Sequence, residues 1–458
     1  MSIRSAAALA GALAALCLEA LPAHAAVWSG AAGLPLSASF PTVARANRSP
    51  AQTQAIRAPA RRSAGQGHTV RGSVRAKVAR IPAPRSLTFA MAMLADPANP
   101  AVTAGSVYAV AATGPATATL VVNGQSVSVP RAIVRELTVP AGVRQPVKRI
   151  NGRIVLGYDM GSAARLAADA ADPVSVVSPL AYVLSDAHGN LQGALANGEI
   201  TAATARGAQV WPIVQSGFNP AQTSAFLASP AAAFTALARI VSIERHRGVS
   251  GVSLDFEDMQ PNDAPLMTRF ARGTSTVLHA MGKWVSIDVT PPSSSPNWGV
   301  VYDRAALARV ADYVAVMTYD EHFPGSPAGS VASIPWTAKS VRDTIASGVP
   351  ASKILVGVPF YTRSWDTLAG RLQSTELPLT TALSYLSLPG ATERWSSRQQ
   401  QDVLTYTRNG IQYEIWLENA ASLRLRGGLV RSDNLAGVAI WDLSQGAPQY
   451  IADLTQSF

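Results

Sequence analysis

The chain has 458 residues, 48% of them hydrophobic and 14% charged, which is enough for one large domain with accessory segments. Its net charge of +10 originates from residues 27–87, which hold ten basic residues and no acidic residue, whereas residues 88–458 carry no net charge. A basic balance confined to one segment, with no Gly-rich phosphate loop, zinc-finger spacing or aromatic RNA motif, argues against a nucleic-acid-binding fold.

The first 25 residues have the pattern of a secretory signal peptide. Arg4 precedes an apolar run of Ala and Leu, and Ala23-His24-Ala25 provides a cleavage site of small residues. We therefore expect export to the periplasm, the cell surface or the extracellular space, with a retained membrane anchor as the alternative. Cys17, the only cysteine, lies inside this segment, so the processed protein would contain no disulfide and no thiol nucleophile.

Residues 26–87 form a predicted linker rich in Ala, Pro, Arg, Ser and Gln, without the periodicity of a helix or a strand. The linker is either a solvated spacer or an electrostatic tether that retains the protein on anionic envelope polymers. Residues 88–148 alternate small apolar and polar residues on both sides of Asn123-Gly124, a dipeptide typical of tight hairpins. We therefore predict a small β-rich module there, to which the sequence assigns no site.

Between residues 149 and 458, short apolar segments alternate with helical patterns, which predicts an α/β fold. Eight such segments fit a closed (β/α)8 barrel, also called a TIM barrel, and we expect it to be monomeric. The interval before the last segment is too long for a simple crossover, which predicts a small α+β insertion at about 366–434. The predicted strands are 153–158, 174–184, 208–214, 251–257, 283–289, 312–320, 353–361 and 436–443.

The strongest chemical signal is the segment GVSLDFED at 251–258. Because side chains alternate along a strand, Ser253, Asp255 and Glu257 share one face, which we predict points into the barrel near its carboxyl-terminal mouth. Two carboxylates this close repel each other, and the repulsion together with burial raises the pKa of one of them. Such a carboxyl group suits general acid catalysis near neutral pH, and an ion-paired strand end is the structural alternative.

These residues resemble the strand-four motif D-G-x-D-x-D-x-E of glycoside hydrolase family 18. Gly251, Asp255 and Glu257 match the motif, whereas Ser253 replaces its middle aspartate and Ser250 its first. The resemblance implies that Glu257 is the catalytic acid, which protonates the glycosidic oxygen. In the family the middle aspartate of the motif helps to tune the aspartate that follows it, which is Asp255 here. Because Ser253 replaces that middle aspartate, the expectation of ordinary chitinase activity is weaker.

The resemblance extends to later segments of the chain. VMTYD matches the strand-six motif M-x-Y-D and implies site roles for Tyr319 and Asp320, while Trp441 matches the aromatic residue under the cleaved sugar. Other segments are similar to the branch of the family that contains spore-cortex-lytic, peptidoglycan-acting N-acetylglucosaminidases. These segments are 319–336, 353–361 and 414–441.

The resemblance implies an exported glycosidase that cleaves β-linked glycan containing N-acetylglucosamine, with peptidoglycan as the expected substrate. A chitinase of the same fold and a non-catalytic glycan-binding envelope protein are the alternatives. The family departs from the usual retaining scheme, because the substrate's own 2-acetamido group acts as the nucleophile. Asp255 would then orient the acetamido N–H, Tyr319 would hold its carbonyl oxygen, and Glu257 would act as acid and later as base. No cofactor and no metal is expected, since the histidines lack metal-ligand spacing.

Further side chains are candidates for lining the sugar groove, although packing in the core is the alternative for each aromatic residue. The expected substrate-binding residues are Trp441, Asp320, Ser253, Tyr182, His322 and Tyr361. Asp288 on the predicted fifth strand is expected to face the barrel interior, and Glu418 to border the groove from the insertion.

Overall fold

The computed structural model describes residues 86–160, 173–368 and 370–458, which belong to one compact unit. The predicted signal peptide and almost all of the predicted linker therefore lie outside the described residues. Within these ranges no single helix is long and apolar enough to cross a membrane. Only the bent pair α4 (Pro220–Ala228) and α5 (Pro230–Glu244) passes that test jointly, by length and composition alone.

The predicted β-rich module is an antiparallel sheet of five strands. Its strands are β1 (Ser86–Ala92), β2 (Val107–Thr113), β3 (Thr117–Val122), β4 (Gln125–Pro130) and β5 (Val134–Pro140), in the order β4-β3-β2-β1-β5. Asn123 and Gly124 join β3 to β4 with φ angles of 50° and 78°, which confirms the predicted two-residue hairpin. On β1, Ala90 packs inside the module, whereas Phe89 and Met91 join the core of the barrel.

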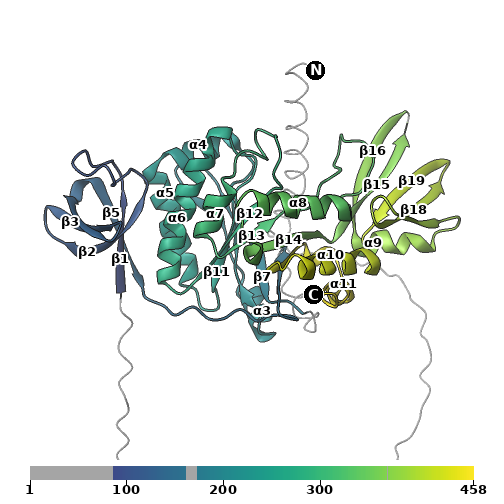
Figure 1. The fold of residues 1–458 in the computed structure, drawn as a ribbon, viewed down its shortest axis with the longest axis horizontal. Helices are drawn as coiled ribbons and strands as arrows, with labels where there is room; N and C mark the ends of the chain where they lie inside the picture. The colour runs from purple at the N-terminus through teal and green to yellow at the C-terminus, as the bar shows by residue number, and fades with distance from the viewer. Residues whose placement is uncertain (1–85, 161–172, 369) are drawn as a thin grey trace, which may run out of the picture. The chain divides into compact units, whose positions relative to one another are not determined.

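The barrel consists of parallel strands at all eight predicted positions (Figure 1). The strands are β6 (Ile154–Asp159), β7 (Val176–Leu184), β9 (Gln209–Val210) with β10 (Ile213–Gln215), β11 (Gly251–Asp255), β12 (Trp284–Val289), β13 (Tyr313–Val316), β14 (Ile354–Pro359) and β20 (Gly437–Trp441). Their order is β10-β11-β12-β13-β14-β20-β6-β7, and pairing of β7 with β10 closes the barrel. The structure therefore confirms the (β/α)8 fold.

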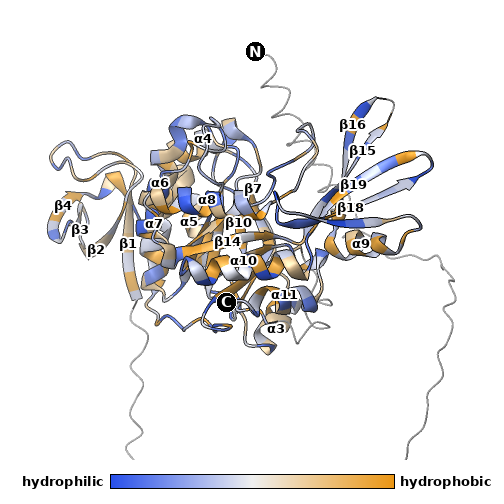
Figure 2. Ribbon diagram, turned by 45° about the vertical axis from the view of Figure 1, so that its right-hand side comes forward, coloured by the Kyte–Doolittle hydropathy of each residue, from blue (hydrophilic) through white to orange (hydrophobic). Residues whose placement is uncertain are grey.

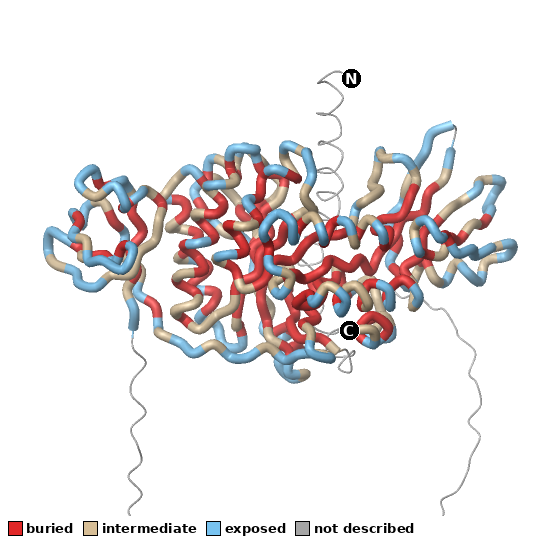
Figure 3. Tube along the Cα trace, in the orientation of Figure 1, coloured by how far each residue is buried: buried red, intermediate tan, exposed pale blue. Residues whose placement is uncertain are grey.

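The barrel strands bury both of their faces, and Figures 2 and 3 show them as the apolar, buried centre of the fold. Inside the barrel, Trp211 stacks on Trp284 and on Tyr313, with ring centroids 6.0 Å and 5.9 Å away. Because Trp284 and Tyr313 begin their strands, these rings fill the amino-terminal end of the barrel. Polar side chains are therefore concentrated at the opposite end, where the strands finish.

Helices cover the outside of the barrel. Besides α4 and α5 they are α3 (Asn197–Ala205), α6 (Ala264–Ala280), α7 (Arg304–Val310), α8 (Ile334–Ala346), α10 (Ala420–Ser432) and α11 (Pro448–Thr455). The side chains of Asn219 and Ser229 cap the first turns of α4 and α5, each of which has proline as its first residue. α6 buries an apolar face that includes Met267, Phe270, Val277 and Leu278.

The segment between β14 and β20 contains a second antiparallel sheet of five strands. Its elements are β15 (Tyr361–Leu368), β16 (Arg371–Pro378), α9 (Leu379–Ser384), β17 (Thr392–Ser396), β18 (Gln401–Arg408) and β19 (Ile411–Leu417), with the strand order β16-β15-β19-β18-β17. This sheet begins earlier and ends earlier than the interval of about 366–434 expected from the sequence. The difference at its end arises because α10 packs on α8 and α11 and so belongs to the helical layer of the barrel.

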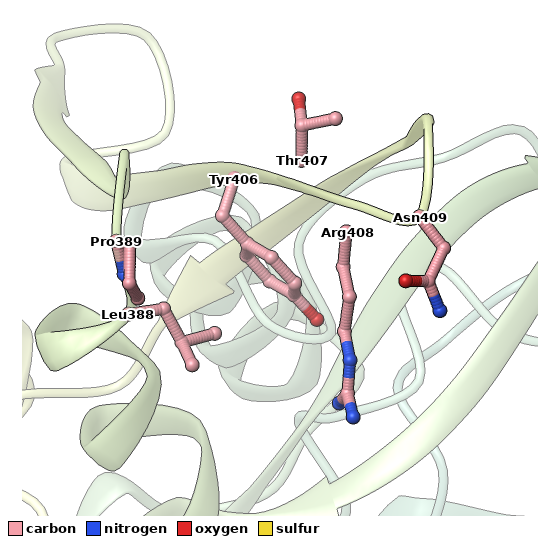
Figure 4. Close-up of a pocket in the computed structure, with 6 residues that line it drawn as sticks. All are labelled: Leu388, Pro389, Tyr406, Thr407, Arg408 and Asn409. Carbon is pink, nitrogen blue, oxygen red and sulfur yellow. The ribbon is translucent and has the colours of Figure 1, made fainter.

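An open pocket with a volume of about 470 Å³ lies in this insertion (Figure 4). Its lining residues are Leu388, Pro389, Tyr406, Thr407, Arg408 and Asn409. The Tyr406 ring stacks on that of Tyr413, with centroids 4.8 Å apart and 7° between the ring planes, so packing holds it in place. No acidic residue lines this pocket, and it is separate from the carboxyl groups described below.

Candidate active site

The residues of the strand-four motif lie where β11 ends and the following loop begins. β11 ends at Asp255, two residues earlier than the sequence predicts, so Glu257 belongs to the loop. Leu254 and Phe256 pack in the core between the strands and the helices, while Ser253 and Asp255 are buried on the opposite face, inside the barrel. The motif therefore presents its polar side chains to the carboxyl-terminal end of the barrel interior.

The backbone of the Glu257 loop is held by two neighbouring side chains. The hydroxyl of Ser216, directly after β10, accepts a hydrogen bond from Glu257 N at 3.1 Å and donates one to Glu257 O at 3.0 Å. Tyr302 donates to the carbonyl oxygen of Phe256 at 2.8 Å. Sequence reasoning missed both residues; the only signal for Ser216 was its place at the carboxyl end of a predicted strand.

Asp255 is almost inaccessible to solvent, with 6% of its surface exposed. Burial raises its pKa to about 7, and a hydrogen bond with the Glu257 side chain partly opposes this rise because it favours the carboxylate. The Oδ1 atom of Asp255 is buried and has no hydrogen-bond partner among the described residues. Asp255 can therefore hold Glu257 and still accept a hydrogen bond from a bound molecule.

Glu257 keeps part of its surface exposed, unlike Asp255. Burial of the carboxyl group raises the pKa of Glu257 well above the usual value for glutamic acid, because burial disfavours the charged form. Repulsion from the carboxylates of Asp255, Asp288, Asp320 and Asp258 raises this pKa further. A protonated glutamic acid at the carboxyl end of a barrel strand can donate its proton to a molecule bound there.

A third carboxyl group, that of Asp288 on β12, lies inside the barrel as the sequence predicts. Asp288 is 2% exposed, and the hydroxyl of Tyr158 donates a hydrogen bond to its Oδ1 at 2.8 Å. Burial raises the pKa of Asp288 well above its usual range and the Asp255 carboxylate raises it further, whereas the hydroxyl groups of Tyr158 and Ser253 lower it. The Tyr158 ring lies 5.4 Å from that of Trp441, so one tyrosine links Asp288 to the aromatic residue at the end of β20.

Tyr319 and Asp320 follow β13 and lie near the same carboxyl groups. Burial and the Glu257 carboxylate raise the pKa of Tyr319 well above the usual value, so its hydroxyl keeps its proton. Asp320 has a φ angle of 58°, and its Oδ1 accepts a hydrogen bond from Tyr361 at 2.6 Å. The rings of Tyr319 and Tyr361 meet edge to face, with centroids 6.2 Å apart. Tyr319 and Asp320 therefore lie near the Glu257 carboxyl group, and Tyr361 of β15 holds Asp320.

Tyr182 and His322, two predicted site residues, make contacts of their own. Tyr182 belongs to the core between β7 and the helices, where the guanidinium of Arg239 on α5 lies 5.7 Å from its ring centroid. Tyr182 therefore faces the helices, and the prediction that it lines the sugar groove is corrected. His322 directs its Nδ1 to the carbonyl oxygen of Pro327 at 2.9 Å, a contact within its own loop.

The loop that carries Asp320 is held by a buried polar network from α10 and the insertion. Arg426 is fully buried and forms an ion pair with Glu418, which is 2% exposed, and it also donates to the carbonyl oxygen of Ala332. Gln401 joins the network to the loop, since it donates to Glu418 and accepts a hydrogen bond from Ser330, both at 2.5 Å. Glu418 is therefore a structural residue of the loop support, and the expectation that it borders the groove is corrected.

The acidic cluster is suited to proton transfer. In the part of the chain that the structure describes, no group of His, Cys, Asp or Glu is arranged to hold a metal ion. The raised pKa values of Asp255, Glu257 and Asp288 favour protonated carboxyl groups near neutral pH.

Comparison with known families supports the resemblance that the motifs carry. Residues 215–446, just over half of the chain, match the family model for glycosyl hydrolases family 18. The chain belongs to glycosyl hydrolase family 18.

The chain is similar to bacterial glycosylases, to a cortical fragment-lytic enzyme and to chitinases. It is 30% identical over 248 residues to YdhD of Bacillus subtilis, a provisionally named sporulation-specific glycosylase. The aligned region covers 52% of this chain and 57% of YdhD. It is 27% identical over 231 residues to the cortical fragment-lytic enzyme of Bacillus subtilis, covering 48% of this chain and 53% of that enzyme. The chain thus spans little more than half the length of these relatives, which confirm the cortex-lytic branch.

The fold is shared with solved structures of the family. The crystal structure of a chitinase from Chromobacterium violaceum has 26% sequence identity and a TM-score of 0.61, covering 67% of this chain and 98% of that chain. The spore cortex-lytic enzyme SleL of Bacillus megaterium has 20% identity and a TM-score of 0.62, covering 73% of this chain and 80% of that chain. The second likeness concerns the fold alone.

Proposed function

We propose that this protein hydrolyses β-linked glycan containing N-acetylglucosamine and that its substrate is peptidoglycan. The observation that carries the proposal is the pair of Asp255 and Glu257, in which a buried carboxyl group holds a partly exposed one whose pKa is raised. Such a pair suits proton donation to a glycosidic oxygen. Family membership supports the reaction, and similarity to the cortical fragment-lytic enzyme supports the substrate.

The reaction proceeds with retention of configuration, through the substrate's own acetamido group. Asp255 and Glu257 lie together at the end of one strand, so a nucleophile from this pair would approach on the same side as the acid. The acetamido carbonyl oxygen instead attacks the anomeric carbon from the opposite face and forms an oxazolinium ion. Glu257 donates its proton to the leaving oxygen as the C–O bond breaks, and later takes a proton from the water that opens the oxazolinium ion.

Neighbouring residues position the sugar for this attack. The unpartnered Oδ1 of Asp255 accepts a hydrogen bond from the acetamido N–H, and the protonated hydroxyl of Tyr319 donates one to the acetamido carbonyl oxygen. Trp441, partly exposed at the end of β20, offers an aromatic face to the sugar ring. Asp320, held by Tyr361, contributes a charge that helps to keep Glu257 protonated.

We also propose that the protein is exported through residues 1–25 and acts as a monomer in the cell envelope or outside the cell. The ten positive charges of residues 27–87, with no acidic residue among them, would retain it on anionic envelope polymers. Such retention weakens as salt concentration rises, because salt screens exposed charges.

Two other functions compete with this proposal. A chitinase is favoured by the structural likeness to the Chromobacterium violaceum enzyme, which the chain covers almost completely. A glycan-binding protein without activity is disfavoured, because Glu257 is present and has the raised pKa of a proton donor.

Digestion of purified peptidoglycan sacculi and colloidal chitin, matched in N-acetylglucosamine content, distinguishes these functions. We expect fragment release from sacculi to be at least about tenfold faster than from chitin, since the enzyme's groove would fit the substituted glycan. Mass spectrometry of the fragments identifies the sugar at the new reducing end. Faster release from chitin would assign a chitinase, and binding to both polymers without release would assign a lectin.

A further inference from the structure

Arg304, the first residue of α7, is a buried cation that the mechanism above leaves without a task. It is 6% exposed, and burial lowers its pKa to about 10, so it stays charged near neutral pH. Among the ion pairs of the described residues, none joins Arg304 to an acidic side chain. A buried charge is costly unless hydrogen bonds satisfy it, so the hydrogen-bond partners of Arg304 show what this charge supports.

The guanidinium of Arg304 joins both ends of the loop that follows β12. Its Nε donates to the carbonyl oxygen of Thr290 at 3.2 Å, and its Nη2 donates to the same oxygen at 2.8 Å and to that of Pro291 at 3.2 Å. Its Nη1 donates to the carbonyl oxygen of Gly299 at 2.9 Å. The planar guanidinium can bond both ends because its donors point in fixed, diverging directions. Arg304 therefore closes the loop of residues 290–299.

The closed loop bonds the neighbouring loop that follows β11. The main-chain N–H of Met259 donates to the carbonyl oxygen of Asn297 at 3.2 Å. The carbonyl oxygen of Phe256 accepts the hydrogen bond from Tyr302, and the guanidinium carbon of Arg304 lies 5.3 Å from the centroid of the Tyr302 ring. These contacts support the loop on both sides, in sequence, of the proposed proton donor.

The loop that follows β10 joins the same unit. Ser216 bonds the backbone N–H and carbonyl oxygen of Glu257, and two residues later the ring of Phe218 lies 6.3 Å from that of Trp298, measured between centroids. The loops after β10, β11 and β12 are therefore linked to one another, and Arg304 closes this unit on the β12 side.

We propose that Arg304 is a positioning residue for Glu257. By closing the loop of residues 290–299, it fixes the β12 side of the segment that carries the acid, and so sets where the carboxyl group lies relative to the glycosidic oxygen. A displacement of about 1 Å in a reacting group can cost roughly 10²-fold in rate. This inference rests on the proposed role of Glu257 as the proton donor.

Arg304→Met tests the proposal, because methionine keeps an apolar side chain in place but cannot bond the loop. On a soluble chito-oligosaccharide we expect kcat to fall roughly 10–100-fold while KM changes by less than about twofold. Arg309→Met is the matched control, since Arg309 lies on the same helix but is exposed, and it should keep the wild-type kcat. Wild-type kcat in Arg304→Met would overturn the proposal.

Chemical rescue separates positioning from packing. Arg304→Ala leaves space for a small cation, and added methylguanidinium should raise kcat by about tenfold or more, whereas methylammonium at the same concentration should not. A folded variant without such rescue would assign Arg304 to packing. If Arg304→Ala does not fold, Arg304→Lys keeps the charge without the planar fork, and wild-type kcat in that variant would overturn the proposal.

Hydrogen exchange without substrate keeps the test independent of the proposed function. Mass spectrometry follows exchange in peptides that cover residues 256–259 and 290–299, in the wild type and in Arg304→Met. We expect exchange in both peptides to be at least about tenfold faster in the variant, with that of β13 unchanged. Unchanged exchange would overturn the proposal, whether or not the protein hydrolyses glycan. Faster exchange in a protein whose wild type hydrolyses no glycan would support the anchoring by Arg304 and contradict the proposed function.

Discussion

Replacing Glu257 by glutamine will lower kcat by roughly 10²–10⁴-fold or more while leaving the fold intact. The amide retains the shape of the side chain and its place beside Asp255, but it has no acidic proton to give to the glycosidic oxygen. Initial rates on sacculi and on a soluble oligosaccharide measure the loss, and the thermal unfolding midpoint checks the fold.

Glu136→Gln on β5 is the matched control for this variant. Glu136 lies in the β-rich module, where it pairs with Arg131 at 3.6 Å, and it takes no part in the proposed site. We expect wild-type kcat for this variant. Near wild-type activity in Glu257→Gln itself would show that another group donates the proton.

Replacing Asp255 by asparagine will lower kcat by roughly 10²-fold. Asparagine cannot supply the negative charge that stabilises the oxazolinium ion, and it removes a carboxylate that raises the pKa of Glu257. The pKa of Glu257 should therefore fall, so that the basic limb of the kcat/KM profile moves to lower pH. A variant with raised KM and unchanged kcat would restrict Asp255 to substrate binding.

The barrel and the grouping of Asp255 with Glu257 could be predicted from the sequence. Apolar strands alternate with helical segments along the chain, and side chains alternate between the two faces of a strand. The predicted strands were apolar segments of the right length, and the polar residues of 251–257 formed one face with Asp255 and Glu257. Asn123-Gly124 likewise has a backbone preference strong enough to predict a hairpin without any tertiary contact.

Other features depend on contacts between distant segments, which no local pattern contains. Tyr182 was expected to face the sugar, but the register between β7 and β10 shifts between Ile213 and Val214, and such a shift reverses the face of the residues beyond it. Ser216 and the Tyr158–Asp288 pair join strands far apart in the chain, so their roles appear only when the barrel is closed.

The extent of the insertion depends on tertiary contacts for a similar reason. α10 was read as part of it because its helical pattern follows directly after strand-like residues, and sequence alone does not reveal on which layer a helix packs. α10 packs on α8 and α11, and its buried Arg426, paired with Glu418, supports the loop that carries Asp320.

The stereochemistry of the product tests the central proposal most directly. Proton NMR follows the anomer released from a chito-oligosaccharide in the first minutes of reaction, before mutarotation, and parallel rates are measured on the de-N-acetylated analogue. We predict that the β-anomer appears first and that removal of the N-acetyl group lowers the rate by at least about 10²-fold, since the nucleophile is then absent. Initial release of the α-anomer, or equal rates on the two substrates, would contradict catalysis by the acetamido group with Glu257 as acid and base.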